Sequence, residues 1–142
     1  MATERDMQAF VVAYQEAWAS REPGAMRALW HPDGVLHHPA LGRAVSGEVV
    51  PYNNDFTKSA IRDFSWQLRR WAHVRDMAFL EWRCQGRLGG DTLEWRGVDV
   101  MVVREGRVAE EQVYLDTYPL RRRLDPTLPD RPLVDPATLG PS

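Results

Sequence analysis

Residues 93–116 read LEWRGVDVMVVREGRVAEEQVYLD, and this stretch decides the fold. Apolar and polar side chains alternate on both sides of Glu105-Gly106, as they do in half-buried strands. We therefore expect a long strand over Leu93–Val103, a tight connection at Glu105-Gly106, and a last strand over Val108–Asp116. A connection this short joins only antiparallel neighbours.

Two further runs rich in aromatic and apolar residues precede this stretch, Ser65–Val74 and Ala78–Arg87. Gly89-Gly90-Asp91 is a typical turn sequence between the second run and the next strand. The four runs together predict an antiparallel meander of four long strands.

The N-terminal part of the chain has a helical pattern. Thr3 and Asp6 form a capping box, and a helix follows until Pro23-Gly24. The apolar stripe of this helix consists of Met7, Phe10, Val11, Tyr14, Ala17 and Trp18. A short second helix carries Met26, Leu29 and Trp30 and ends at the turn signal His31-Pro32-Asp33-Gly34. A brief strand over Val35–His38 and a third helix over roughly Glu48–Ile61 follow.

This order of elements predicts an α+β domain, a cone-shaped α+β barrel in which three N-terminal helices pack on a curved, mostly antiparallel sheet. Such a cone leaves room for a pocket between the helices and the concave face of the sheet. We expect the domain to span residues 1–118. Residues 119–142 are expected to form a Pro-rich tail without regular structure, either wrapped over the body or partly mobile.

The composition is that of one soluble globular domain, with 142 residues, 44% hydrophobic and 27% charged. The formal charge of -2 gives no field that would select nucleic acid or a membrane. The single cysteine, Cys84, excludes an intrachain disulfide framework and a Cys-based zinc site. We expect a cytoplasmic protein, because no apolar run reaches the length of a membrane span and the N-terminus lacks a signal-peptide core.

Asp99 is the first candidate for chemistry. Strand alternation places it on one face with Trp95, Gly97, Met101 and Val103. If that face is covered, the pKa of Asp99 rises, and a neutral carboxylic acid suits a general acid or a donor to a developing oxyanion. Asp116 closes the last strand and shares a face with Tyr114, so it is a second candidate. Either carboxylate can instead lie on an exposed face and pair with an Arg.

His37 and His38 are neighbours in a strand, so only one of them enters a pocket, where an imidazole is a natural base near neutral pH. Tyr14 lies in the apolar stripe of the first helix, and its hydroxyl must find a substrate carbonyl or a backbone partner inside. No metal is expected, because no pair of His has the spacing of a helical metal site.

Large side chains are expected to line the pocket, although most Trp in proteins serve the core. The expected substrate-binding residues are Trp18, Trp30, Tyr52, Phe56, Trp82, Trp95, Met101 and Tyr114. The sequence has no Gly-rich phosphate loop, no nucleophile elbow and no basic patch interleaved with aromatics. We therefore expect no cofactor and no nucleic-acid partner.

Several short patterns occur together along the chain. They are Phe10-x-x-x-Tyr14-x-x-Ala17-Trp18, Ala28-Leu29-Trp30-x-Pro32-Asp33-Gly34-Val35, Pro39-x-x-Gly42, Gly97-Val98-Asp99-Val100, and Arg104-Glu105-Gly106-Arg107-Val108-x-Glu110 leading to Tyr114-x-Asp116. With these patterns the chain resembles the nuclear transport factor 2-like superfamily, most closely its SnoaL-like and ketosteroid-isomerase-like branch. The resemblance covers roughly residues 5–118 and is specific for fold, while the superfamily hosts many reactions.

The resemblance also implies roles for single residues. Tyr14 and Asp99 match the oxyanion-hole tyrosine and the protonated aspartic acid of ketosteroid isomerase. The isomerase base, an aspartate before a proline, falls at His38, and Asp116 resembles the acid/base aspartate of SnoaL-type polyketide cyclases. A limonene epoxide hydrolase would need a carboxylate at Val113, so that chemistry ranks lower.

We therefore expect a cofactor-independent acid/base enzyme that acts on a hydrophobic carbonyl or polyketide-like small molecule, by aldol cyclisation or by enolisation and isomerisation. Asp116 or His38 would abstract a proton, and Asp99 with Tyr14 would stabilise the enolate. The alternatives are a non-catalytic small-molecule-binding domain, an epoxide hydrolase or cyclase of the same fold, and a structural domain whose pocket is filled by its own side chains.

A homodimer packed through the sheets is also expected, and no membrane partner. The outer sheet face carries Val98, Val100 and Val102, which is more apolar surface than a monomer usually exposes. The resemblance implies the same assembly.

Overall fold

A computed structural model of the chain describes residues 2–129 and 133–140. Six strands form one sheet in the order β2-β1-β6-β5-β4-β3. Their bounds are β1 Trp30–His37, β2 Val45–Ser46, β3 Arg62–Val74, β4 Met77–Leu88, β5 Asp91–Arg104 and β6 Arg107–Leu115. The helices are α1 Glu4–Ala19, the 3₁₀ helix η1 Ala25–Leu29, α2 Val49–Ala60, α3 Tyr118–Leu124 and the 3₁₀ helix η2 Pro136–Leu139.

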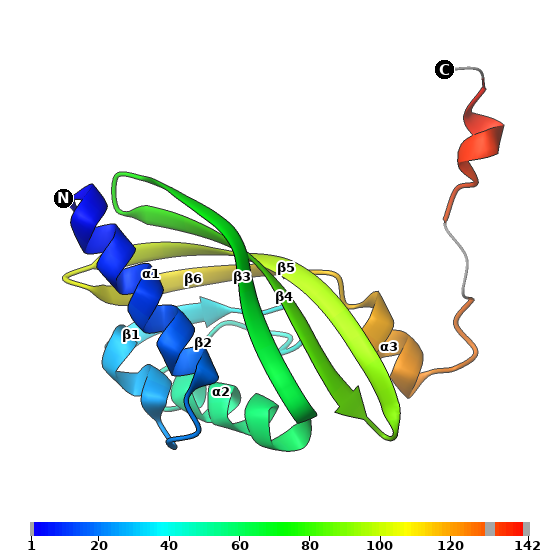
Figure 1. Ribbon diagram of the computed structural model, residues 1–142, viewed down its shortest axis with the longest axis horizontal. Coiled ribbons are helices and arrows are strands. Elements are labelled where there is room, and N and C mark those ends of the chain that lie inside the picture. The colour runs from blue at the N-terminus through cyan, green and yellow to red at the C-terminus, as the bar shows by residue number, and fades with distance from the viewer. Residues whose placement is uncertain (1, 130–132, 141–142) are drawn as a thin grey trace.

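The expected α+β architecture is confirmed. Three helices, α1, η1 and α2, pack on a strongly curved sheet, and Figure 1 shows α1 lying across the strands with α2 at the bottom of the view. The sheet is antiparallel except where β1 runs parallel to β6. It does not close into a barrel, because β2 and β3 remain its two edges.

The predicted meander is present, and each of its hairpins turns through two residues. Val74 pairs with Met77, and Arg75 between them has a φ of 56°. Glu105 and Gly106 have φ values of 54° and 72° between the paired Arg104 and Arg107. Positive φ at both central positions, as at Glu105-Gly106 and Gly89-Gly90, is the backbone of the turn whose twist matches that of antiparallel strands, whereas in the first hairpin only Arg75 has positive φ.

The stretch His31–Gly34 was expected to be a turn, and that prediction is wrong. β1 begins at Trp30 and runs through these residues, with an irregular register between Trp30 and Val35 where it follows β6. Gly34 makes this path possible, because a Cβ there would lie 2.9 Å from the Val108 carbonyl oxygen. None of these four residues pairs with β6, so they form a bulge that keeps a local bend inside one continuous strand. The second helix is correspondingly shorter and ends at Leu29.

Helix α1 follows its sequence pattern closely. The Thr3 hydroxyl accepts from the Asp6 amide, and the Asp6 carboxylate accepts from the Thr3 amide, so the capping box is confirmed. Its buried residues are Met7, Phe10, Val11, Tyr14 and Ala17. Lys58 of α2 donates to the carbonyl oxygens of Ala17 and Ser20 and so holds α2 against the C-terminal end of α1. Within residues 2–129 and 133–140, no helix is long and apolar enough to cross a membrane.

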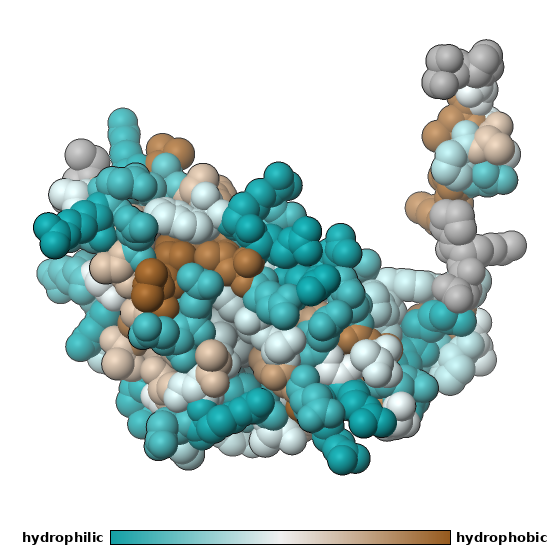
Figure 2. Space-filling model, viewed as in Figure 1, coloured by the Kyte–Doolittle hydropathy of each residue, from teal (hydrophilic) through white to brown (hydrophobic). Residues whose placement is uncertain are grey.

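The prediction that residues after Pro119 lack regular structure is wrong for two segments. α3 begins at Tyr118, and Pro119 sits in its first turn, where the missing amide has no helical partner. Arg123 of α3 donates to the carbonyl oxygens of Leu88 and Gly89 and so ties α3 to the end of β4. Residues 133–140 are exposed and include η2. Figure 2 shows a mostly hydrophilic surface, with hydrophobic side chains gathered between α1 and β3.

Candidate active site

A cavity of about 380 Å³ lies between the helices and the concave face of the sheet. Its walls come from α1, α2, β1 and the inner positions of β3, β4, β5 and β6. This is the place where the sequence predicted a pocket. Asp99 and Glu111 line it from the sheet, and Tyr14 lines it from α1.

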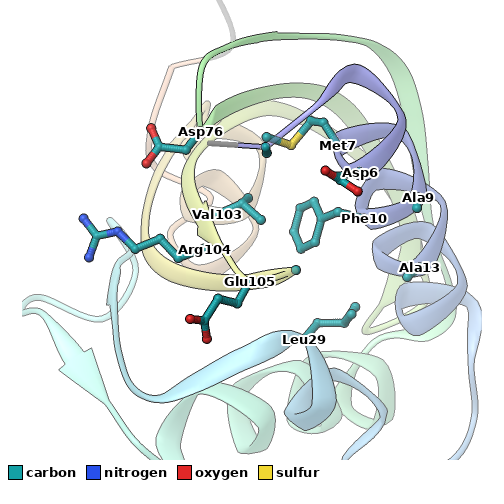
Figure 3. A pocket seen from close by; sticks show the side chains of 12 residues that line it. Asp6, Met7, Ala9, Phe10, Ala13, Leu29, Asp76, Val103, Arg104 and Glu105 are labelled. Atoms are coloured by element: carbon teal, nitrogen blue, oxygen red, sulfur yellow. The ribbon is translucent and has the colours of Figure 1, made fainter.

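A second, larger hollow of about 760 Å³ lies near the start of α1. Figure 3 shows Met7 and Phe10 of α1 facing Val103 of β5 across it, while the carboxylates of Asp76 and Glu105 turn away. This hollow is open to solvent and none of its carboxylates is buried. The smaller cavity is therefore the candidate active site, because buried ionisable groups converge only there among the described residues.

Aromatic rings form the walls of the cavity. Trp18 and Trp66 stack with 5.9 Å between ring centroids and 6° between planes. Tyr14 meets Trp66 edge-on at 5.6 Å, and Phe64 packs against Trp95 at 6.1 Å. A site of this kind favours flat, apolar ligands and excludes much of the surrounding water.

A cluster of hydrogen-bonded acidic groups lies inside this aromatic shell. The Tyr14 hydroxyl lies 3.2 Å from Asp99 Oδ2 and 3.0 Å from Glu111 Oε1, so it can donate its proton to either carboxyl group. Trp82 Nε1 donates to Asp99 Oδ1 at 2.8 Å. Asp99 is 3% exposed and Glu111 is 4% exposed. We call Tyr14, Trp82, Asp99 and Glu111 the acid cluster.

The register of the sheet places the cluster. Glu111 of β6 pairs with Met101 of β5, so it is a diagonal neighbour of Asp99 on the same face. Trp82 of β4 pairs with Gly97 of β5, and its indole ring lies where a Cβ of residue 97 would be. The missing side chain of Gly97 thus lets the Trp82 ring lie flat enough to reach Asp99.

Burial controls the protonation of the cluster. Burial, followed by the charge of Asp99, raises the pKa of Glu111 well above its usual value. Burial raises the pKa of Asp99 to about 6, opposed by hydrogen bonds from Trp82, Glu111 and Tyr14. The expected rise in the pKa of Asp99 is confirmed. At neutral pH the two carboxyl groups share one proton, which lies mainly on Glu111.

This protonation predicts how stability depends on pH. A group whose pKa is higher in the folded protein stabilises it at low pH, and that contribution is lost as pH rises through the folded pKa. For Asp99 the loss falls between the ordinary pKa of 3.8 and about 6, and Glu111 extends it to higher pH. We measure the difference in Tm between the wild type and an Asp99→Asn/Glu111→Gln double variant, and we expect it to fall from about pH 4 to about pH 6 and to continue falling at higher pH. A difference in Tm between the two proteins that does not change with pH would contradict the raised pKa values.

His38 is the histidine that lines the cavity, and His37 lies 3.4 Å from Glu110 outside it. Burial lowers the pKa of His38, so the ring is neutral at neutral pH. Its Nδ1 accepts the backbone N–H of Ala40 at 3.1 Å. The proton of the neutral ring must then be on Nε2, which makes His38 a hydrogen-bond donor and leaves no free lone pair for a base.

Most of the expected site residues line the cavity, and their functional roles stay predictions. Among the expected catalytic residues these are Tyr14, His38 and Asp99. Among the expected substrate-binding residues they are Trp18, Trp30, Phe56, Trp82 and Trp95. Cys84 also lines the wall, where burial raises the pKa of its thiol and keeps it neutral.

Four expected residues lie elsewhere. Asp116 follows β6 at an exposed position and accepts the backbone N–H of Tyr118, so its placement in the pocket was wrong. Tyr114 shares that outer face and is 61% exposed. Tyr52 is exposed on the far side of α2, and Met101 is fully buried in the core beneath the cavity.

Glu111 was missed by the sequence analysis, although a signal for it exists. By strand alternation Glu111 lies on the same face of β6 as the apolar residues Val113 and Leu115. Asp116 follows on the opposite face, which carries Gln112 and Tyr114. If the face with Val113 and Leu115 is assigned to the interior, Glu111 is predicted to be the carboxyl group that points inward.

Comparison with known proteins agrees with this architecture. A sequence profile of the SnoaL-like domain matches residues 11–111. The structure of TsrD from Streptomyces laurentii is similar with a TM-score of 0.73 and 18% identity, covering 88% of this chain and 98% of TsrD. Wild-type IdmH from Streptomyces antibioticus, a candidate polyketide cyclase, gives a TM-score of 0.70 and 19% identity, covering 82% and 96% of the two chains.

A protein of ketosteroid isomerase-like fold from Catenulispora acidiphila, solved with trimethylamine, gives a TM-score of 0.67 and 20% identity, covering 74% of this chain and 83% of that one. Comparison with curated protein sequences finds no match. The expected resemblance is therefore confirmed for the fold and for the sequence profile. The chain belongs to the SnoaL-like domain family of the nuclear transport factor 2-like superfamily.

Proposed function

We propose that the protein is a cofactor-independent acid/base enzyme that enolises a hydrophobic carbonyl compound, in a cyclisation or an isomerisation. One observation carries the proposal. Two buried carboxyl groups, Asp99 and Glu111, share a proton inside an aromatic cavity and are hydrogen-bonded to Tyr14. Such a pair supplies a base and an acid side by side at neutral pH.

The proposed reaction uses both members of the pair. The Asp99 carboxylate takes a proton from the carbon next to the substrate carbonyl, and the C–H electron pair forms an enolate. Tyr14 and the protonated Glu111 donate hydrogen bonds to the enolate oxygen. In a cyclisation the enolate carbon then attacks a second carbonyl of the same molecule, whose oxygen takes up the C=O electron pair and receives the proton from Asp99. In an isomerisation Asp99 returns the proton to another carbon of the enolate system.

Tyr14 is suited to this role because burial and the charges of Asp99 and Glu111 raise its pKa well above its usual value. It therefore stays a neutral O–H donor. We assign His38 to hydrogen bonding through Nε2 rather than to proton abstraction, since its Nδ1 is engaged by Ala40. The base of the proposed reaction is therefore Asp99, and not His38 or Asp116 as expected from the sequence.

The lining favours an uncharged ligand. Among the described residues that line the cavity there is no Lys or Arg, and the one His is neutral. An anionic ligand would meet two carboxyl groups that share only one proton, without a compensating cation. A flat aromatic ketone fits both this charge pattern and the ring-lined walls.

The proposal is tested by hydrogen exchange, which needs no knowledge of the natural substrate. 2-Tetralone is incubated with the protein in D₂O, and deuterium uptake next to its carbonyl is followed by NMR. We expect uptake faster than in buffer at the same pH, saturating with ketone concentration. Binding of the ketone without faster uptake would instead support the alternative of a non-catalytic binding domain.

We also propose a homodimer formed through the outer sheet face. Val98, Val100 and Val102 lie half-buried on this face, and Phe79 pairs with Val100 on the neighbouring strand. Burying such surface against a second copy stabilises the pair, while a carboxylate at its centre would be desolvated without a partner. We expect light scattering to give a dimer mass for the wild type and a monomer mass for Val100→Asp. A wild-type monomer mass at all concentrations would contradict the proposal.

A further inference from the structure

Asn54 of α2 is a buried polar side chain whose hydrogen-bonding groups have no partner in the described part of the chain. It is 3% exposed, and neither its Nδ2 nor its Oδ1 makes a hydrogen bond. It lines the same cavity as the acid cluster, but from a different wall. Its neighbour Thr57 also lines the cavity, and its hydroxyl already donates to the Asn53 carbonyl oxygen at 2.9 Å.

An unpartnered amide inside a protein is costly, since both its N–H groups and its carbonyl have lost their water. An apolar residue of similar size would fill the same space without that cost. The last torsion of Asn is soft, so a small rotation can aim the amide at a group in the cavity. A buried amide without hydrogen-bond partners next to a cavity therefore indicates that a ligand supplies the partner that the free protein lacks.

We propose that Asn54 is a second polar anchor of the cavity, which selects flat hydrophobic ligands with a hydroxyl or carbonyl group remote from the group held by the acid cluster. The amide offers both a donor and an acceptor, so it suits a hydroxyl that gives and receives a hydrogen bond. The ring-lined walls between the two anchors suit a fused aromatic frame. This inference rests on the proposed function only in assigning the cavity to a small molecule, and not on proton transfer.

The inference predicts two effects of opposite sign for Asn54→Leu. The free variant should melt about 2–4 °C higher than the wild type, because the orphaned amide is gone. It should also no longer distinguish ligands that carry a polar group at both ends from ligands that carry one at a single end. The probes are 2-naphthol, with one hydroxyl, and naphthalene-2,6-diol or naphthalene-2,7-diol, with a second one, and binding is measured by quenching of tryptophan fluorescence.

We expect the wild type to bind the better diol about tenfold more tightly than 2-naphthol, and Asn54→Leu to bind both alike. Thr57→Val is the matched control, because its hydroxyl is already satisfied, and it should keep the preference for the diol. Equal affinities of the wild type for the diols and 2-naphthol would overturn the inference without any variant. A diol preference that survives in Asn54→Leu, or a lower melting temperature of that variant, would also overturn it.

The two proposals fail separately in these experiments. Absence of enzyme-dependent deuterium exchange would contradict the proposed acid/base enzyme, but it would not affect the expected preference for a diol. Absence of a diol preference in the wild type would contradict the role of Asn54 as an anchor, but it would not affect the expected exchange by the acid cluster.

Discussion

Asp99→Asn should lower the rate of deuterium uptake by 2-tetralone by about 10²–10⁴-fold, the usual contribution of a positioned base. The substitution keeps the shape of the side chain and its ability to accept from Trp82 Nε1. It removes the carboxylate that would take the proton. Binding of the ketone, followed by tryptophan fluorescence, should change little, so that the loss lies in the exchange step.

Asp116→Asn is the matched control for this experiment. Asp116 is an exposed aspartate that caps the turn into α3 and lies outside the cavity, so its variant should exchange at the wild-type rate. Glu111→Gln keeps a donor toward the enolate oxygen and should lose less activity than Asp99→Asn. Wild-type exchange in Asp99→Asn, together with loss in Glu111→Gln, would move the base to Glu111.

The strand meander could be predicted from the sequence because local signals specify it. Glu105-Gly106 and Gly89-Gly90-Asp91 are turn sequences whose backbone preference matches tight hairpins. Alternation along β5 places Asp99 on one face with Trp95 and Met101, and the rise in its pKa follows once that face is covered. The turns and the alternation depend on neighbours within a few residues along the chain, whereas the burial of Asp99 depends on distant residues such as Tyr14.

The remaining features depend on partners far along the chain. β1 continues on both sides of the bulge at His31–Gly34 because β6 pairs with Trp30 before it and with Val35 after it, and no local sequence pattern predicts that pairing. In β6 the alternation favours Glu111 as the inward carboxyl group, but α1, which covers it, and Tyr14, which bonds to it, lie far away along the chain. The orphaned amide of Asn54 likewise exists only once α2 has packed over the cavity.

Gly97→Ala should destabilise the folded protein by about 1–3 kcal/mol or more, which is the usual cost of overpacking. A Cβ at this position would lie 2.5 Å from Trp82 Cζ2 and 2.5 Å from the Tyr114 carbonyl oxygen. The ring must move, and the strand pairing between β5 and β6 must loosen. Urea unfolding of the variant and the wild type measures the loss.

The same substitution should disturb the acid cluster, because the displaced Trp82 ring takes its N–H away from Asp99. That bond lowers the pKa of Asp99 against the effect of burial, so its loss moves the pKa further up. NMR titration of the Asp99 carboxyl carbon should therefore show a higher pKa in Gly97→Ala than in the wild type. An unchanged pKa would mean that the indole keeps its bond to Asp99.

A double-mutant cycle with Trp82→Phe separates the two clashes. The phenyl ring lacks the indole atoms nearest to the new methyl group, so Gly97→Ala should cost less in the Trp82→Phe background than in the wild type. The cost that remains reports the contact with the Tyr114 carbonyl oxygen. An equal cost in both backgrounds would mean that the backbone contact alone requires glycine at position 97, and that the Trp82 ring does not depend on it.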